Sequence, residues 1–147
     1  MNVDVVSDIE IEASVREVSM YAADPDNAPN WYEKIESVEW VTPPPLEQGS
    51  KLRFVAQSLG RRLEYTYEVV EYKAGRRLVM RTSQGPFPME TTYVWEKLPG
   101  DRTRMTLRNR GQPAGFSKLI APLMRGAMKR AVEADLRGLK ALFEGSR

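Results

Sequence analysis

The chain opens with an alternation of apolar and acidic residues. Between residues 3 and 12, Val3, Val5, Ile9 and Ile11 fall on one side, and the acidic residues of the segment fall on the other. A period of two residues is typical of a β-strand that buries one face. The pattern therefore predicts a half-buried strand at residues 3–12.

Six further segments repeat this alternation, and most of the turns between them are short and contain glycine or proline. Strands joined by short connections pair as antiparallel neighbours, because a parallel pair needs a long crossover. We therefore expect one antiparallel sheet of seven strands. The six further strands are predicted at residues 35–42, 51–58, 61–72, 77–84, 89–98 and 102–110.

The segment between the first two predicted strands carries helical signals. Ser14 precedes Glu17 by three residues, which is the spacing of a capping box at a helix N-terminus. Pro25 and Pro29 then interrupt the helical pattern. We expect two short helices here.

The C-terminal part of the chain changes to a helical period. From residue 119 to residue 144 the apolar residues form one broad stripe opposite a side rich in lysine and arginine, which predicts a long amphipathic helix. Gly115 marks its entry, and Pro122 predicts a first turn that is kinked or separate. A bent sheet needs a cover for its apolar face, and this helix can supply it. The pattern thus predicts an α+β fold in a single domain, residues 1–147.

Four segments carry a family resemblance. They are IEIEASVREVSMYAADPDNAPNWYEKIESVE near the start, EYTYEVVEYKAGRRLVMR in the middle, and ETTYVWEKLPGDRTRMTL and LIAPLMRGAMKRAVEADLRGLKALFEG towards the end. These segments resemble the START-like superfamily, also called SRPBCC, and in particular its polyketide cyclase/dehydrase and lipid-transport branch. The resemblance implies the helix-grip fold, with a seven-stranded curved sheet around the C-terminal helix. It also implies a cavity between sheet and helix for lipids, isoprenoids, polyketides or similar apolar molecules.

Composition narrows the chemistry. Cysteine and histidine are both absent, which excludes disulfides, thiolate nucleophiles, Ser-His-Asp triads and the commonest zinc ligands. The sequence contains no phosphate-binding glycine loop and no zinc or calcium motif. We expect no cofactor and no metal, and any catalysis must use carboxylates, tyrosine, lysine or arginine.

Charge and hydropathy bear on partners and location. The net charge is +2, which is too small to predict nucleic-acid binding. We interpret the basic side of the last helix as a surface exposed to solvent. No apolar run approaches the roughly 18 residues of a transmembrane segment, and the acidic N-terminus does not resemble a signal peptide. We therefore expect a cytoplasmic protein, and a homodimer stays open.

The inward positions of the predicted strands and helix supply candidate ligand contacts. They combine a deformable apolar lining with a few hydroxyl groups and one amide, as small-molecule cavities do. Plain core packing is the competing interpretation for each apolar member of the set, and a stiff hairpin around Phe87 and Met89 could act as a lid or simply pack. The predicted ligand-binding residues are Trp31, Phe54, Tyr65, Tyr67, Met80, Thr82, Thr91, Tyr93, Met105, Leu107, Asn109, Met124 and Met128.

One acidic residue lies near the apolar stripe of the last helix. Asp135 could be buried and paired with Arg62 or Arg81, and such a carboxyl group could donate a proton. Solvated charge is the simpler interpretation. No residue is therefore predicted to be catalytic.

Three functions compete at this point. The first is binding or carriage of an apolar small molecule, such as a lipid, isoprenoid or aromatic polyketide. The second is a polyketide cyclase or dehydratase that templates its substrate and uses Tyr65, Tyr67 or Tyr93 as an acid. The third is a protein-interaction module. The missing histidine favours the first.

Overall fold

The structure, a computed structural model, describes residues 3–58, 60–112 and 121–145. The predicted helix entry at Gly115 and the predicted helical residues 119–120 lie outside these ranges. The elements follow in the order β1 (Val3–Ile11), α1 (Val15–Ala23), the 3₁₀ helix η1 (Pro25–Asn27), α2 (Ala28–Trp31), β2 (Ile35–Trp40), β3 (Lys51–Ser58), β4 (Arg61–Lys73), β5 (Arg77–Gln84), β6 (Met89–Leu98), β7 (Arg102–Gly111) and α3 (Ala121–Glu144).

The short helices form where the capping signals placed them. The backbone N–H of Glu17 donates to the Ser14 hydroxyl at 3.1 Å, as in a capping box, and that hydroxyl donates to the Glu17 carboxylate at 3.2 Å. Pro25 then starts η1, which leads directly into α2. This helical segment carries the chain from β1, at one edge of the sheet, to β2 at the other.

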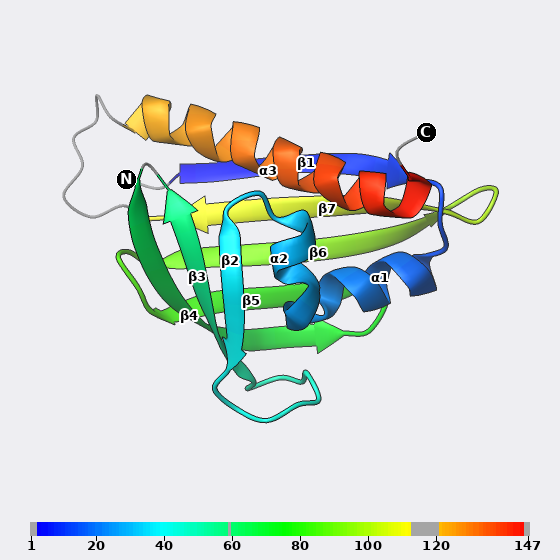
Figure 1. Ribbon diagram of the computed structural model, residues 1–147. Coiled ribbons are helices and arrows are strands. Elements are labelled where there is room, and N and C mark those ends of the chain that lie inside the picture. The colour runs from blue at the N-terminus through cyan, green and yellow to red at the C-terminus, as the bar shows by residue number, and fades with distance from the viewer. Residues whose placement is uncertain (1–2, 59, 113–120, 146–147) are drawn as a thin grey trace.

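The seven strands form one antiparallel sheet in the order β1-β7-β6-β5-β4-β3-β2. Strands β2 to β7 are a meander, and β1 joins it beside β7. Figure 1 shows the sheet curving so that its concave side faces α3, with α1 and α2 on that same side. The α+β helix-grip architecture predicted from the pattern and the resemblance is confirmed.

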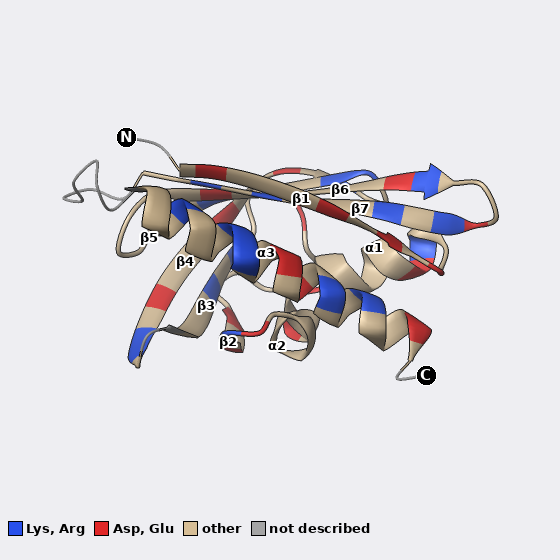
Figure 2. Ribbon diagram, turned by 90° about the horizontal axis from the view of Figure 1, so that it is seen from above, with Lys and Arg blue, Asp and Glu red and all other residues tan. Residues whose placement is uncertain are grey.

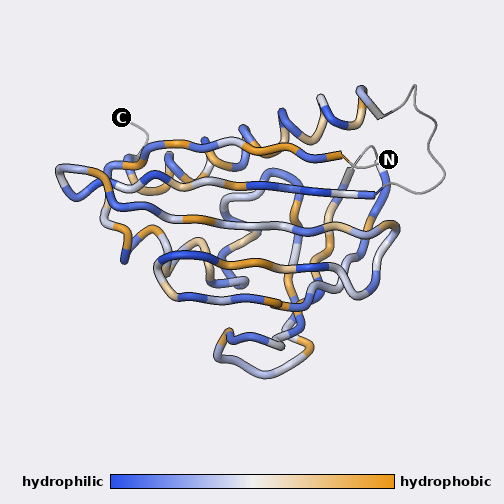
Figure 3. Tube along the Cα trace, turned by 180° about the vertical axis from the view of Figure 1, so that it is seen from behind, coloured by the Kyte–Doolittle hydropathy of each residue, from blue (hydrophilic) through white to orange (hydrophobic). Residues whose placement is uncertain are grey.

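The hydrophobic core lies on the concave face of the sheet. Leu52, Val69, Leu78 and Leu107 are each at most 1% exposed, and they occupy the positions that the period of two assigned to the inner face. Figure 3 shows hydrophobic and hydrophilic stretches interspersed along the strands. The alternation therefore predicted the buried face of β3, β4, β5 and β7 correctly.

Helix α3 packs tightly against the sheet through its C-terminal half. Val132, Leu136 and Leu139 are at most 1% exposed, whereas Leu123 near its beginning is 73% exposed. Within the described residues α3 runs from Ala121 to Glu144, and the first turn that Pro122 was predicted to kink or separate lies largely outside them.

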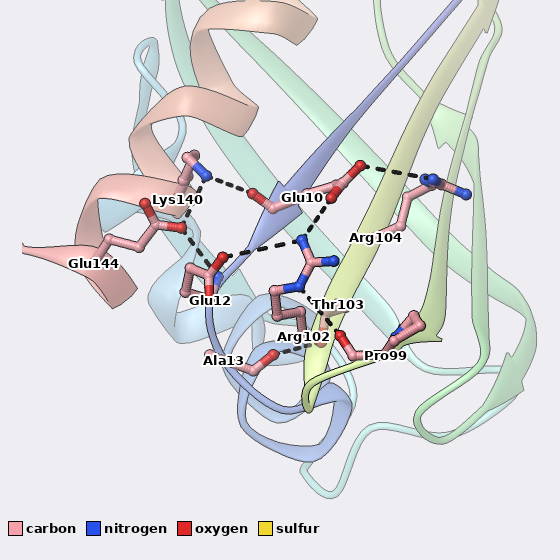
Figure 4. A network of polar contacts seen from close by, with 9 residues as sticks. All are labelled: Glu10, Glu12, Ala13, Pro99, Arg102, Thr103, Arg104, Lys140 and Glu144. Carbon is pink, nitrogen blue, oxygen red and sulfur yellow. Dashed lines mark hydrogen bonds and ion pairs between the residues drawn. The ribbon is translucent and has the colours of Figure 1, made fainter.

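A polar network fixes the same half of the helix to β1 (Figure 4). The Lys140 ammonium donates to the Glu10 backbone carbonyl at 2.6 Å and to the Glu144 carboxylate at 2.8 Å. That carboxylate also accepts the backbone N–H of Glu12 at 3.0 Å. Arg102 of β7 pairs with the Glu10 side chain at 2.8 Å. Helix, edge strand and neighbouring strand are thus joined at one point.

The lysines of α3 also protect the free edge of the sheet. A second one, Lys129, donates to the backbone carbonyl of Val6, so two carbonyl groups of the edge strand β1 are occupied. An uncovered edge offers such groups to other chains. Figure 2 shows acidic and basic residues interspersed over β1, β7 and α3. In the described part of the chain, no helix combines the length and the apolar character needed to cross a membrane.

Two glycines of α3 provide a matched test of the helix docking. A Cβ atom at Gly138 would lie 2.7 Å from the Trp31 backbone oxygen, whereas one at Gly126 would meet only the mobile end of Arg130 at 3.4 Å. We expect Gly138→Ala to lower the free energy of unfolding by about 1–3 kcal/mol, because backbone must move. Gly126→Ala should raise it by about 0.5–1 kcal/mol, the usual gain for a helix interior.

Urea unfolding of both variants beside the wild type measures this difference. Equal stability of the two alanine variants would contradict the close approach of α2 to α3.

Candidate functional site

A cavity of about 680 Å³ lies between the concave face of the sheet and α3. The helix contributes Met124, Ala127, Met128, Ala131 and Asp135 to its wall. Each of these positions is three or four residues from another member of the set, and they therefore lie on one side of the helix. Since 11 residues separate Met124 from Asp135, the cavity follows the helix for about 16 Å.

Nine of the thirteen predicted ligand contacts line this cavity. Strands β3 to β7 bring seven of them together, and α3 brings two. They are Phe54, Tyr65, Tyr67, Met80, Thr91, Tyr93, Asn109, Met124 and Met128. Their role in binding stays a prediction, since a residue that lines the cavity need not contact a ligand.

Met105 and Leu107 do not line the cavity, although both point to the concave face. Each is 0% exposed, and the Trp95 indole N–H lies 3.2 Å from the Met105 sulfur. They belong to the closed end of the sheet, where the C-terminal half of α3 lies directly on the strands. The period of two identified the face on which they lie. It did not identify the point along the sheet where direct packing of α3 ends and the cavity begins.

Trp31 and Thr82 also lie outside the cavity wall. The Trp31 ring packs against Tyr32, with centroids 4.2 Å apart, and it is 3% exposed. The Thr82 hydroxyl accepts the Met89 backbone N–H at 2.9 Å, so it holds together the strands on either side of the β5–β6 turn. Both residues support neighbours that do line the cavity.

Thirteen lining residues were absent from the predicted set. Most come from the segment after α2, from the ends of β3 and β4, and from the β5–β6 turn, where strand alternation gives little guidance. They are Tyr32, Glu33, Lys34, Ile35, Ala56, Arg61, Leu63, Pro86, Phe87, Met89, Ala127, Ala131 and Asp135. Phe87 sits edge-on to Tyr65, with ring centroids 6.3 Å apart, so the stiff hairpin forms part of the wall.

Two tyrosine side chains in the cavity wall, Tyr32 and Tyr93, are hydrogen-bonded to each other. The hydroxyl oxygens of Tyr32, which follows α2, and Tyr93 of β6 are 2.5 Å apart. Burial raises the pKa of both well above the usual value and raises the pKa of Tyr67 to about 12. All three phenols are therefore protonated at neutral pH. One hydroxyl of the Tyr32–Tyr93 pair donates to the other, so the pair keeps one proton for a further acceptor.

Asp135 is the buried acid of the site. Asp135 is 6% exposed, and its carboxylate oxygen Oδ1 accepts a hydrogen bond from the backbone N–H of Glu33 at 2.9 Å. Burial is the main cause that raises the pKa of this carboxyl to about 7. It can therefore exist in either protonation state near neutral pH.

The possible ion pair of Asp135 with Arg62 or Arg81 is wrong. Arg81 pairs with Glu90 at 2.8 Å on the outer face, and Arg62 is exposed. Among the residues that the structure describes, none forms an ion pair with Asp135. Strand alternation places both arginines on the face away from the helix, which explains the error.

A second polar pair lies at the other side of the wall. Thr91 of β6 and Asn109 of β7 are directly opposite each other, and the threonine hydroxyl donates to the Asn109 side-chain oxygen at 2.8 Å. The amide nitrogen of Asn109 keeps its donors for another partner. Over the described ranges, no group of three or more acidic side chains could hold a metal ion.

Comparison with solved structures identifies the same fold in other organisms. The chain is similar to the protein TTHA0849 from Thermus thermophilus (24% identity, TM-score 0.82, 97% of this chain and 99% of that one). It is also similar to a START superfamily protein from Mycobacterium smegmatis (17% identity, TM-score 0.83, 96% and 97%). A third is the Zhui aromatase/cyclase from Streptomyces sp. R1128 (16% identity, TM-score 0.82, 98% and 94%). At these identities the likeness shows the fold alone.

Sequence comparison identifies the family. No curated protein is significantly similar to the chain. The family model described as "Polyketide cyclase / dehydrase and lipid transport" matches residues 2–144, which is nearly the whole chain. The chain therefore belongs to the polyketide cyclase/dehydrase and lipid transport family.

Proposed function

We propose that this protein binds an apolar small molecule with a polar end in the cavity between the sheet and α3. The observation that supports this most directly is the distribution of groups in the wall. Tyr32, Tyr93 and Asp135 form a polar group at one end of a largely apolar space, and Thr91 and Asn109 form a second polar pair in the wall. The cavity volume, about 680 Å³, lies within the range of about 300–1,000 Å³ usual for small-molecule sites.

The two ends of the cavity differ in chemistry. Tyr93 and Asp135 lie deep in the wall, beside the part of α3 that is packed on the sheet. Met89 is four residues from Tyr93 along β6, about 13 Å at the usual rise of a strand, and Met124 is three turns of helix from Asp135. An elongated molecule would place its polar group at the first end and its apolar body towards the second.

The lining suits an apolar body of variable shape. Met80, Met124 and Met128 all line the cavity, and unbranched thioether side chains adapt to ligands of different outline. Phe54 and Tyr67 meet edge to face, with centroids 5.4 Å apart, and provide a firmer aromatic wall opposite. Family membership supports ligand binding in general terms, and the identity of the ligand belongs to this proposal.

Filling the cavity tests the proposal. We expect Met128→Trp to abolish binding of the neutral fluorescent probe N-phenyl-1-naphthylamine, because the larger ring occupies the space that the probe needs. Met20→Trp is the matched control, since Met20 is 63% exposed on α1 and lies outside the cavity wall. Fluorescence titration measures affinity, and a thermal melt of each variant checks the fold.

Wild-type protein that neither binds this probe nor carries a co-purified molecule in native mass spectrometry would contradict the proposed function. Unchanged probe affinity in a folded Met128→Trp variant would instead remove this part of the wall from the site.

The buried phenols give a second test. We expect Tyr67→Phe and Tyr93→Phe each to weaken 2-(2-naphthyl)ethanol by about 0.5–1.5 kcal/mol, the usual net value of one neutral hydrogen bond. Binding of 2-ethylnaphthalene, which has no polar group, should be almost unaffected. Tyr72→Phe is the control, because Tyr72 is half-buried outside the cavity.

Isothermal titration with the two naphthalene compounds measures these differences. Equal losses for both compounds would indicate a packing effect and would contradict hydrogen bonding by the phenols.

A second candidate function is that of a polyketide cyclase or dehydratase, and Asp135 is the observation that favours it. A carboxyl group with a pKa of about 7 can take a proton from a carbon next to a carbonyl group at neutral pH. A phenol such as Tyr93 could donate a hydrogen bond to the carbonyl oxygen as negative charge develops there. Together these steps would start an aldol cyclisation.

Turnover of a poly-β-ketone thioester tests this candidate. If Asp135 is the base, kcat/KM should rise with pH through about 7 and level off above it, because only the ionised carboxylate accepts a proton. Asp135→Asn should lower turnover a hundredfold or more, and Glu133→Gln on the same helix should not. Turnover no faster than the spontaneous reaction would exclude this candidate.

A further inference from the structure

The polar end of the cavity holds a buried carboxyl group that lacks a cation. We infer that the ligand of this protein carries a positively charged nitrogen, an alkylammonium or similar amine, which pairs with Asp135 among the aromatic rings of Tyr32 and Tyr93. This inference rests on the proposed function, because it names the class of molecule that the cavity binds.

The surroundings of Asp135 on its own helix are apolar. The residues one turn away are Ala131, Val132, Gly138 and Leu139, and Val132 and Leu139 are 0% exposed. Helix neighbours at these spacings are the usual source of an intrahelical ion pair. Here none of them carries a charge.

The elements packed against Asp135 also leave it without a counter-ion. The segment after α2 contributes Tyr32, Glu33 and Lys34, and β6 contributes Tyr93. The two phenols are protonated and bonded to each other. Lys34 is exposed, and although its charge lowers the pKa of Asp135, it forms no ion pair with the carboxyl group.

The carboxyl group is nevertheless held in place. Its Oδ1 accepts the backbone N–H of Glu33 at 2.9 Å, whereas Oδ2 receives no hydrogen bond from a described residue. Because Asp135 lines the cavity, a bound molecule can reach the group. Geometry therefore leaves one acceptor position ready for a donor on the ligand.

A cation fits this position better than a neutral donor. A buried carboxylate without an opposite charge is unfavourable, and this is why the pKa of Asp135 is raised to about 7. A hydroxyl group on the ligand would supply a hydrogen bond only. An ammonium group would supply the hydrogen bond and the missing charge, and would return the pKa towards its usual range.

Two other features of the wall favour a cation. Aromatic rings attract ammonium groups through their negative faces, and Tyr32 and Tyr93 line this end of the cavity. Trp31, outside the wall, packs against both, with centroid distances of 4.2 and 5.7 Å. Glu33 also lines the cavity, and its negative charge further raises the pKa of Asp135. Over the whole wall, Lys34 and Arg61 balance Glu33 and Asp135, so the preference for a cation rests on the buried carboxyl group and the aromatic rings at this end.

Three probes with one apolar body test the inference. They are 2-(2-naphthyl)ethylamine, 2-(2-naphthyl)ethanol and 2-naphthylacetate, each measured at pH 8.5 by displacement of N-phenyl-1-naphthylamine from the whole chain. We expect the amine to bind at least tenfold more tightly than the alcohol, and the carboxylate to bind most weakly. Asp135→Asn should remove the preference for the amine, and Glu133→Gln, which also removes one negative charge from α3, should retain it.

Lowering the pH gives a measurement that needs no variant. At pH 5.5 Asp135 is mostly protonated, because its pKa is about 7, whereas an alkylamine with a pKa of about 10 keeps its charge. The advantage of the amine over the alcohol should therefore shrink towards zero between pH 8.5 and pH 5.5.

The outcomes separate this inference from the proposed function. Equal displacement by all three probes, or the tightest binding by the carboxylate, would overturn the inference and leave the cavity as a ligand site. An amine preference that persists in Asp135→Asn or at pH 5.5 would also overturn it. Failure of the wild type to bind N-phenyl-1-naphthylamine or any of the three probes would overturn both.

Discussion

The unequal docking of α3 is the constraint on which the rest of this structure depends. Its C-terminal half is held by apolar side chains such as Val132 and Leu139, both 0% exposed, and by Lys140, which bonds to the backbone of β1. Its N-terminal half lies over a sheet that curves away from it. A straight helix on a bent sheet cannot pack equally along its length, so closing one end leaves space at the other.

The position of Asp135 follows from the same geometry. It stands where the packed half of α3 meets the open half, between Ala131 in the cavity wall and Leu136, which is 1% exposed. A carboxyl group at this boundary is shielded from bulk water by the core yet open to a bound molecule. An unpaired buried acid is unfavourable for folding, and the apolar contacts on either side of it offset that penalty.

Much of the fold could be predicted from the sequence because its signals are local. The sequence pattern identified seven strands and the inner faces of most of them, and the stripe over α3 identified the covering helix. The site depends on distances between elements, which no local pattern contains. Met80 and Met105 share the same inward pattern, yet one lines the cavity and the other is closed off beneath the helix.

The residues that were missed illustrate the same limit. Tyr32 follows a short helix and belongs to no strand, so periodicity could not direct it into the cavity, and only the fold brings it to Tyr93, 61 positions later. Asp135 did carry a signal, an acid within an apolar stripe. The proposed partners Arg62 and Arg81 could have been rejected, because strand alternation turns them to the opposite face. The bond from the Glu33 backbone could not be predicted, because it joins segments 102 positions apart.

The pKa shifts of the cavity residues matter for function because the chain contains no histidine. In a chain with neither histidine nor cysteine, a side chain that titrates near neutral pH must be one whose pKa is shifted from its usual value. Burial acts on the site in two directions, since it moves the phenols of Tyr67 and Tyr93 further from neutrality and moves Asp135 towards it. The phenols are therefore fixed donors across the physiological range. Asp135 alone among these three changes charge there, so the pH dependence of binding or turnover in this cavity should follow that carboxyl group.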